Sequence, residues 1–468
     1  MRLKRFIKTA LVFLTGNVLI KLVSFLLLPL YTNNLSPDQF GSYDFVMTII
    51  NLIAPIAFFQ IWDGMYRYAF DYDKKQDKQN VITNSIVVCL FGCVIYFALF
   101  SLVQYFFEFQ YFEYIIIYGL LYALNYLYTY TARIFLANKL FVFSGVIGTL
   151  TTALLNIAFI VGLGWDIKSI YVSSIIGIII QLLIIELKVG VLRHFRISKT
   201  DYALIVQMIK FSFPLCIATI SYWLLSGYTK FLVINFNGDS ANGIYAIANK
   251  FSSMITLLVS VLQFAWNETA YLMTNESERK KNYPIFIDIM TTGVAYGVAV
   301  FILVSKVIFP YVISDQYHEA IYLVPATVIG VGANSLAGFL GTLFMTEKKT
   351  NYILISTLLS SLVNIILGYF ATKYYGVYGA AVVLALSFVI LMVLRLTKLK
   401  RMYDINLKVV KLASLLSVIA ISTLAFFLLD SNVEIIVVIL IIILMFVFSM
   451  REYFKYIKNL ILPNKRGE

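Results

Sequence analysis

Three lysines lie inside long apolar runs of the sequence, where a charged side chain is unfavourable: Lys21, Lys230 and Lys250. A lysine at the centre of a membrane-spanning helix costs about 3 kcal/mol on insertion scales, so it requires water or an anionic partner. An ammonium group is a compact point charge that binds phosphate without a fixed two-pronged geometry. The three positions therefore predict a cationic site that holds an anionic ligand.

Polar residues accompany these lysines at helical spacing. Asn17, Lys21 and Ser24 follow an i, i+4, i+7 pattern, and Tyr222, Ser226 and Lys230 follow an i, i+4, i+8 pattern. Both patterns place polar groups on one face of a helix. We expect these faces to line a water-filled cavity, together with the polar residues of the neighbouring runs, which are Asp44, Asn51, Asn249, Ser253, Thr256 and Gln263.

Two alternatives to cavity cations remain open for the lysines. Lys21 could form a structural ion pair with Asp44, and Lys230 could extend its ammonium to the membrane interface, as we expect for Lys306.

The composition defines the elements that must position these residues. Of the 468 residues, 61% are hydrophobic and 13% are charged, whereas soluble domains have about 25% charged residues. Fourteen apolar runs are long enough to cross a bilayer. They are 9–31, 39–62, 81–107, 112–136, 142–163, 167–187, 211–234, 241–267, 285–309, 319–346, 350–371, 376–397, 409–429 and 433–453. We therefore predict an all-α, polytopic membrane protein with about 14 transmembrane helices. Its three cysteines, Cys89, Cys93 and Cys216, have neither metal-ligand nor disulfide-framework spacing.

Basic residues concentrate in every second loop. Thirty-one of the 37 Lys and Arg residues lie in the two termini and the loops on the same side, whereas the opposite loops contain only Lys168 and Lys373. The positive-inside rule then predicts a cytoplasmic-type membrane with both termini in the cytoplasm. It also explains the net charge of +13 without a nucleic-acid partner.

The sequence resembles itself at an offset of about two hundred residues. Residues 34–43 and 236–245 both carry a Gly-x-Tyr before the next run, and residues 154–160 and 362–368 align Asn156 with Asn364. Six predicted spans separate the copies, so both halves enter the membrane in the same direction, as parallel repeats do. We predict six-helix bundles at 1–200 and 201–400, followed at 401–468 by two additional transmembrane helices and a cytoplasmic tail.

Three segments resemble the polysaccharide transporter family of the multidrug/oligosaccharidyl-lipid/polysaccharide exporter superfamily. They are LSPDQFGSYDFVMTIINLIAPIAFFQIWDGMYRY (35–68), Ala-Asn-Lys (137–139) and YYGVYGAA (374–381). The resemblance implies two bundles that face a central cavity. It also implies a Wzx-type flippase that moves a polyprenyl-diphosphate-linked repeat unit from the cytoplasmic to the outer leaflet, for capsule, O-antigen or a related polysaccharide.

The resemblance also implies the partners. They are the lipid-linked oligosaccharide, membrane lipid, a proton or sodium as coupling ion, and the polymerase and glycosyltransferases of the same pathway. No cofactor is expected. A diphosphate carries about two negative charges, so the lysines suit it. Asn, Ser, Thr and Gln side chains could bind the sugar hydroxyls, and tyrosine rings could stack on the sugars, although tyrosines are also common at membrane interfaces.

Three other functions would make different demands on the sequence. A cation-coupled multidrug exporter of the same superfamily would require carboxylates deep in the membrane. The first span contains no acidic residue, and its one charged residue is Lys21. A lipid II flippase has closely similar chemistry and stays open. A membrane glycosyltransferase or polymerase requires acidic groups on substantial outer loops, which are short here, and no Gly-Lys-Ser/Thr loop for ATP is present. We therefore predict a transporter rather than an enzyme.

The orientation can be tested with reporter fusions. Fusions at Asp73, Ser198 and Glu276 should report a cytoplasmic location, because they lie in lysine- and arginine-rich loops. Fusions at Asn33, Asn237 and Gln316 are the controls and should not. Termini on opposite sides would contradict both the orientation and the repeat.

Overall fold

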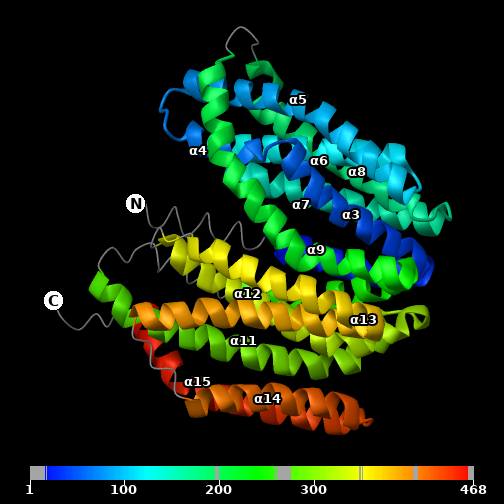
Figure 1. Cartoon of the computed structure of the whole chain (residues 1–468), viewed down its shortest axis with the longest axis vertical. Helices are drawn as coiled ribbons and strands as arrows, with labels where there is room; N and C mark the ends of the chain where they lie inside the picture. Colours follow the sequence, from blue (N-terminus) through cyan, green and yellow to red (C-terminus); the bar gives the residue numbers. More distant parts are fainter. Residues whose placement is uncertain are drawn as a thin grey trace. The chain divides into compact units, whose positions relative to one another are not determined.

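The computed structural model describes residues 16, 18–195, 200–257, 259–260, 276–346, 349, 351–403 and 409–461. Within these residues every regular element is a helix, and no strand is present (Figure 1). The all-α prediction is therefore confirmed. The chain divides into two compact units, Met1–Ala246 and Ile247–Glu468. This division includes the seventh predicted span in the first unit, and the arrangement as two six-helix bundles with two further helices stays a prediction.

Most of the described helices are long and apolar enough to cross a membrane. Ten stretches are long and apolar enough to cross a membrane, and a shorter apolar helix covers Val18–Asn34. Two of the ten, Tyr202–Leu257 and Asn351–Tyr403, each contain two spans, because the backbone bends at Gly238 (φ 83°) and Gly376 (φ 59°). A positive φ suits glycine, which has no Cβ. The described residues thus contain ten candidate spans and a shorter apolar helix, and the full number of about 14 transmembrane helices stays a prediction.

The first unit is built around a tightly packed core. Its helices are α2 (Leu28–Asn34), α3 (Pro37–Ala57), α4 (Ile61–Ala69), α5 (Lys75–Phe107), α6 (Phe112–Ile134), α7 (Asn138–Ile157) with a π-helical end (Ala158–Gly162), α8 (Lys168–Val189), a 3₁₀ turn (Leu192–His194) and most of α9 (Tyr202–Ser252). Helix α6 packs against α3, α4, α5, α7 and α8, and α5 to α8 lie side by side (Figure 1). It is therefore the central helix of this unit.

Local sequence determines how α3 starts and ends. Ser36 accepts a hydrogen bond from the Gln39 amide, and the Gln39 side chain accepts one from the Ser36 amide, with Pro37 as the first helical residue. The second span was predicted as one helix, but α3 ends at Ala57 and α4 begins at Ile61. The break lies at Phe59 and Gln60, whose left-handed backbone conformations end the helical course of the chain after Pro55.

The second unit contains α11 (Glu276–Val312), a 3₁₀ helix (Asp315–Leu323), α12 (Val324–Thr346), α13 (Asn351–Tyr403), α14 (Val409–Leu428) and α15 (Asn432–Ile461). Helix α11 packs against α12, α14 and α15, and α12 packs along α13 (Figure 1). Lys411 of α14 forms an ion pair with Asp288 of α11 at 2.6 Å. This pair ties the last two helices to the rest of the unit.

Lys306 of α11 binds the C-terminal end of α14. Its ammonium donates to the carbonyl oxygens of Phe426, at 2.6 Å, and Leu429 at the C-terminal end of α14, and Asp430 lies 3.7 Å away. Carbonyls at a helix end lack intrahelical partners and carry partial negative charge. Lys306 therefore caps α14 rather than extending freely to the interface.

Arg395 is a buried arginine that fastens α13 to α12. Its guanidinium and Nε donate to the Ala337 carbonyl at 2.7 Å, the Ser356 hydroxyl at 3.1 Å and the Thr357 hydroxyl at 3.0 Å. These acceptors come from α12 and from the first half of α13, whereas Arg395 lies in the second half. One side chain thus joins three helical segments.

Replacing Arg395 by Met should destabilise the protein by about 2 kcal/mol or more, because buried acceptors of a charged donor lose their partner. The measurement is thermal unfolding of the purified chain in detergent. Arg401→Met, at an exposed position of the same helix, is the matched control and should leave the midpoint unchanged. Equal midpoints for both variants would contradict this role of Arg395.

Candidate functional site

A cavity of about 600 Å³ lies within the first unit, between α3, α4, α6 and α9. Its lining combines aromatic rings with a few polar and charged groups, a composition typical of ligand sites. The lining residues are Thr48, Asn51, Pro55, Gln60, Trp62, Asp63, Tyr122, Tyr126, Tyr130, Thr219, Tyr222, Trp223, Ser226, Gly227 and Lys230. Lys230 is the one basic residue among them.

The break between α3 and α4 forms part of the cavity lining. Phe59 and Gln60 adopt left-handed backbone conformations (φ 52° and 46°), which are uncommon for residues other than glycine. The Gln60 side chain donates to the Asp63 carboxylate at 2.8 Å and accepts from the Thr219 hydroxyl at 3.1 Å. Such irregular backbone at membrane depth is tolerated where protein or water surrounds it. The break thus turns polar groups towards the cavity.

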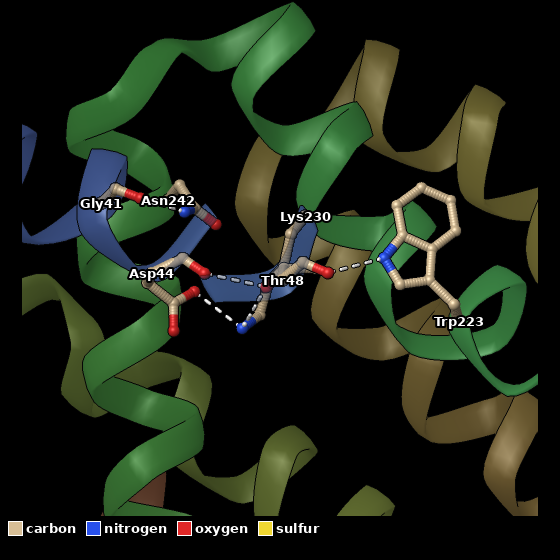
Figure 2. Close-up of polar contacts among 6 residues, drawn as sticks. All are labelled: Gly41, Asp44, Thr48, Trp223, Lys230 and Asn242. Carbon is tan, nitrogen blue, oxygen red and sulfur yellow. Dashed lines mark hydrogen bonds and ion pairs between the residues drawn. The ribbon is translucent and has the colours of Figure 1, made fainter. Parts of the chain in front are cut away.

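Lys230 forms an ion pair at this site (Figure 2). Its Nζ lies 2.7 Å from an Asp44 carboxylate oxygen and donates to the Thr48 hydroxyl at 3.3 Å. The indole N–H of Trp223, which lies on α9 like Lys230, donates to the Thr48 carbonyl at 3.1 Å. The pair is largely shielded, with 22% of the Lys230 side chain and 11% of the Asp44 side chain exposed. The ammonium is therefore compensated and held against α3.

Helices α3 and α9 approach each other closely near this ion pair. The Asn242 side chain donates to the Gly41 carbonyl at 2.7 Å (Figure 2). A Cβ on Gly41 would lie 1.9 Å from the Asp239 carbonyl oxygen, and one on Gly243 would lie 2.0 Å from that of Pro37. Only glycine permits so close a backbone approach at both positions. The two Gly-x-Tyr copies of the repeat therefore meet each other here.

Three tyrosines of α6 form one wall of the cavity, and we call Tyr122, Tyr126 and Tyr130 the tyrosine wall. Their i, i+4, i+8 spacing places them on one face of the helix. The ring centroids of Tyr122 and Tyr126 are 5.0 Å apart, and those of Tyr126 and Tyr130 are 6.1 Å apart. The Tyr122 hydroxyl donates to the Asn51 side chain at 3.0 Å.

A second acidic group, Asp63, lies at the Tyr130 end of this wall. Its carboxylate accepts a hydrogen bond from the Gln60 side chain at 2.8 Å, and the positive charge of Arg133 lies near it. The Arg133 guanidinium lies 4.8 Å from the ring centre of Tyr66 and 5.4 Å from that of Tyr130, a cation–π arrangement. Arg133 thus offsets the negative charge of Asp63.

Several predicted site residues come together in this cavity. Asn51, Tyr222, Ser226 and Lys230 line it, and Asp44 reaches it through its ion pair with Lys230. The predicted alternatives were a Lys21–Asp44 ion pair and a Lys230 ammonium at the membrane interface, and the structure shows an ion pair between Lys230 and Asp44 instead. Asp44 pairs with Lys230 on α9, because the Gly41 crossing brings these helices together.

The residues of the first span lie elsewhere. Lys21 and Ser24 are exposed and are not part of this lining, and the Ser24 hydroxyl donates to the Ile20 carbonyl at 2.9 Å. Asn17 and Gln263 lie outside the described residues. A role for Lys21 in binding stays a prediction.

The predicted residues after Ala246 belong to the second unit. Lys250 and Asn249 are half-buried there. The Ser253 hydroxyl donates to the Lys250 carbonyl at 2.6 Å, and the Thr256 hydroxyl donates to the Ser253 carbonyl at 2.6 Å. Such bonds compete with the helical ladder, and α9 ends at Ser252 within the predicted span 241–267. A binding role for these residues stays a prediction.

The sequence analysis missed five of the six aromatic residues of the cavity lining and three of its polar residues. The missed lining residues are Gln60, Trp62, Asp63, Tyr122, Tyr126, Tyr130, Thr219 and Trp223. The i+4 spacing of the tyrosines was a usable signal, because it selects one helix face. The left-handed residues after Pro55 had no comparable signal, since neither of them is glycine.

A double-mutant cycle can test the ion pair. Asp44→Asn and Lys230→Met should each destabilise the protein, because the remaining charge loses its partner in a poorly solvated place. The double variant should recover part of the loss, with a coupling of about 1–3 kcal/mol, measured by unfolding in detergent. The exposed pair Arg67–Asp71 is the control and should show little coupling. Additive effects at Asp44 and Lys230 would contradict the pairing.

Comparison with known proteins agrees with this architecture. A family model described as "Polysaccharide biosynthesis protein" matches residues 6–266. No curated protein sequence matches significantly. A multidrug resistance MATE family transporter of the MOP superfamily, in an inward-facing conformation, is similar in structure, with a TM-score of 0.65 and 14% identity over 82% of this chain and 94% of that one.

Two further solved structures share the fold. The lipid II flippase MurJ in an inward closed conformation gives a TM-score of 0.63 and 15% identity, covering 96% of this chain and 99% of that one. A MOP superfamily transporter from Pyrococcus furiosus gives 0.57 and 15%, covering 86% and 96%. At these identities the likeness shows the fold, while the family match covers more than half of the chain. As its motifs predicted, the chain belongs to the polysaccharide biosynthesis protein family, and it shares its fold with these solved transporters.

Proposed function

We propose that this protein is a flippase for a polyprenyl-diphosphate-linked oligosaccharide, moving the repeat unit from the cytoplasmic to the outer leaflet of the cell membrane for capsule, O-antigen or a related surface polysaccharide. The observation that carries the proposal is the Lys230 ammonium in the lining of a polar and aromatic cavity. Membership of the polysaccharide biosynthesis protein family supports the glycan as cargo. Both termini are cytoplasmic in this proposal.

Lys230 binds the diphosphate by exchanging partners. In the described state its charge is compensated by Asp44 at 2.7 Å, so the site holds no uncompensated cation. A diphosphate carries about two charges and attracts an ammonium more strongly than a single carboxylate at the same distance. The cargo therefore draws Lys230 away from Asp44. Asp44 is then the carboxylate that a coupling proton or sodium ion occupies.

Lys21 and Lys250 keep their predicted roles as further cations for the diphosphate. Both lie on polar faces of apolar helices, where a charge requires a functional or structural reason. Their contribution is secondary in this proposal, because the structure does not place them in the lining of the Lys230 cavity. The enzymes of the same glycan pathway are the proposed partners, and the protein itself transports without chemical change to the cargo.

Other transport functions make different demands on the same site. A multidrug exporter for cations requires carboxylates that are free to pair with the drug, whereas Asp44 pairs with Lys230 and Asp63 is close to Arg133. The lipid II substrate would also present a polyprenyl diphosphate with sugars. It differs in its glycan, so the glycan that accumulates in a deletion strain distinguishes the two.

Replacing Lys230 by Met should abolish glycan export in cells that depend on this protein, because the diphosphate loses its cation. Surface glycan and accumulated lipid-linked repeat units are measured together, at matched protein levels. Lys21→Ala and Lys250→Ala should also reduce export, and Lys230→Arg should retain part of it, since the charge is kept.

Lys373→Met is the matched control, because Lys373 is exposed and lies outside the cavity lining. It should export at the wild-type rate. The proposal fails if Lys230→Met also exports at that rate, or if the accumulated lipid carries a chemically altered glycan, which would indicate an enzyme.

A further inference from the structure

The tyrosine wall is distinct from the Lys230 site within the same cavity. Tyr122, Tyr126 and Tyr130 come from α6, whereas Lys230 comes from α9 and pairs with α3. From Tyr122 to Tyr130 the helix rises about 12 Å, at 1.5 Å per residue. The wall therefore offers three successive aromatic rings over a length greater than one sugar ring, with neighbouring ring planes at 64° and 53° to each other.

Neighbouring side chains hold the rings of this wall in place. The buried Trp62 indole stacks on Tyr126, with ring centroids 4.8 Å apart and planes at 20°. The Tyr122 hydroxyl donates to the Asn51 side chain at 3.0 Å, and Tyr130 lies next to Asp63. A preorganised surface loses little conformational entropy when a ligand binds. Its rigidity is what a stacking platform requires.

The chemistry of the wall favours a pyranose ring. Such a ring has an apolar face of C–H groups and a rim of hydroxyls. Aromatic rings can pack on the C–H face of the sugar. The tyrosine hydroxyls, together with Asn51, Gln60 and Asp63, can donate hydrogen bonds to the sugar hydroxyls and accept hydrogen bonds from them. A prenyl chain would instead leave these polar groups without partners. An organic cation would require an uncompensated carboxylate, and Arg133 offsets Asp63.

We propose that the tyrosine wall is a sugar-binding site that stacks the pyranose rings adjacent to the diphosphate of the cargo. This inference rests on the proposed function and deepens it, since it assigns one part of the cargo to each part of the cavity. Lys230 takes the diphosphate, and the wall takes the glycan.

The test compares ligands with and without a sugar on the purified full-length chain in detergent. The probes are farnesyl diphosphate and farnesyl diphosphate carrying one glucose or N-acetylglucosamine, and binding is followed by tryptophan fluorescence. In the wild type each sugar should tighten binding about tenfold, a gain typical of one aromatic stacking contact with hydrogen bonds. Tyr126→Leu should remove that gain, and Tyr126→Phe should keep it.

Farnesyl diphosphate itself should bind Tyr126→Leu as it binds the wild type, which also shows that the variant is folded. If Tyr126→Leu does not fold, Tyr122→Leu provides the same comparison. Tyr105→Leu is the control, because Tyr105 is 80% exposed and lies outside the cavity lining. It should change no affinity.

Three results would overturn the sugar site. The first is equal affinity of the wild type for farnesyl diphosphate with and without a sugar. The second is a gain in affinity from the sugar that survives Tyr126→Leu. The third is that Tyr126→Leu loses binding of the organic cation tetraphenylphosphonium while sugar binding is unchanged, which would indicate a cation site. Failure of the proposed function has a different signature: Lys230→Met would bind farnesyl diphosphate as tightly as the wild type does.

Discussion

An ammonium group in an apolar protein must be compensated, and much of the first unit is organised around this requirement at Lys230. The partner, Asp44, lies on α3, so α9 has to approach α3 closely enough for an ion pair at 2.7 Å. Gly41 and Gly243 allow that approach, and Asn242 fixes it with a bond to the Gly41 carbonyl. Because desolvating two charges offsets much of their attraction, the pair is better suited to exchanging partners than to supplying stability.

The rest of the cavity follows from the break in the second span. At the turn formed by Phe59 and Gln60, the Gln60 side chain contacts both the Asp63 carboxylate and the Thr219 hydroxyl of α9. Non-glycine residues in the left-handed region cost roughly 1–3 kcal/mol each. This strain is located where the lining is most polar, as expected where backbone geometry serves binding rather than stability.

The all-α architecture could be predicted from the sequence, because apolar runs of membrane length leave few other structures. The repeat also indicated Gly41 and Gly243 as equivalent positions, and the structure brings these two into contact. The choice of Lys230 over Lys21 as the partner of Asp44 could not be predicted, since it depends on which helices cross. Hydropathy does not contain that information.

The aromatic wall illustrates a different limit. Tyr122, Tyr126 and Tyr130 are regularly spaced, but tyrosines on one helix face can equally meet lipid headgroups. Only the packing of α6 at the centre of the unit directs them to the cavity. The break after Pro55 was also missed, because proline is tolerated in many membrane helices and the left-handed turn that follows it uses Phe59 and Gln60.

The central claim is that the diphosphate and Asp44 compete for Lys230. The most direct measurement is the affinity of farnesyl diphosphate for the purified wild type, Asp44→Asn and Lys230→Met. If the two anions compete, Asp44→Asn should bind about tenfold more tightly than the wild type, and Lys230→Met should bind more weakly. Weaker or unchanged binding by Asp44→Asn would contradict the exchange, and unchanged binding by Lys230→Met would remove Lys230 from the site.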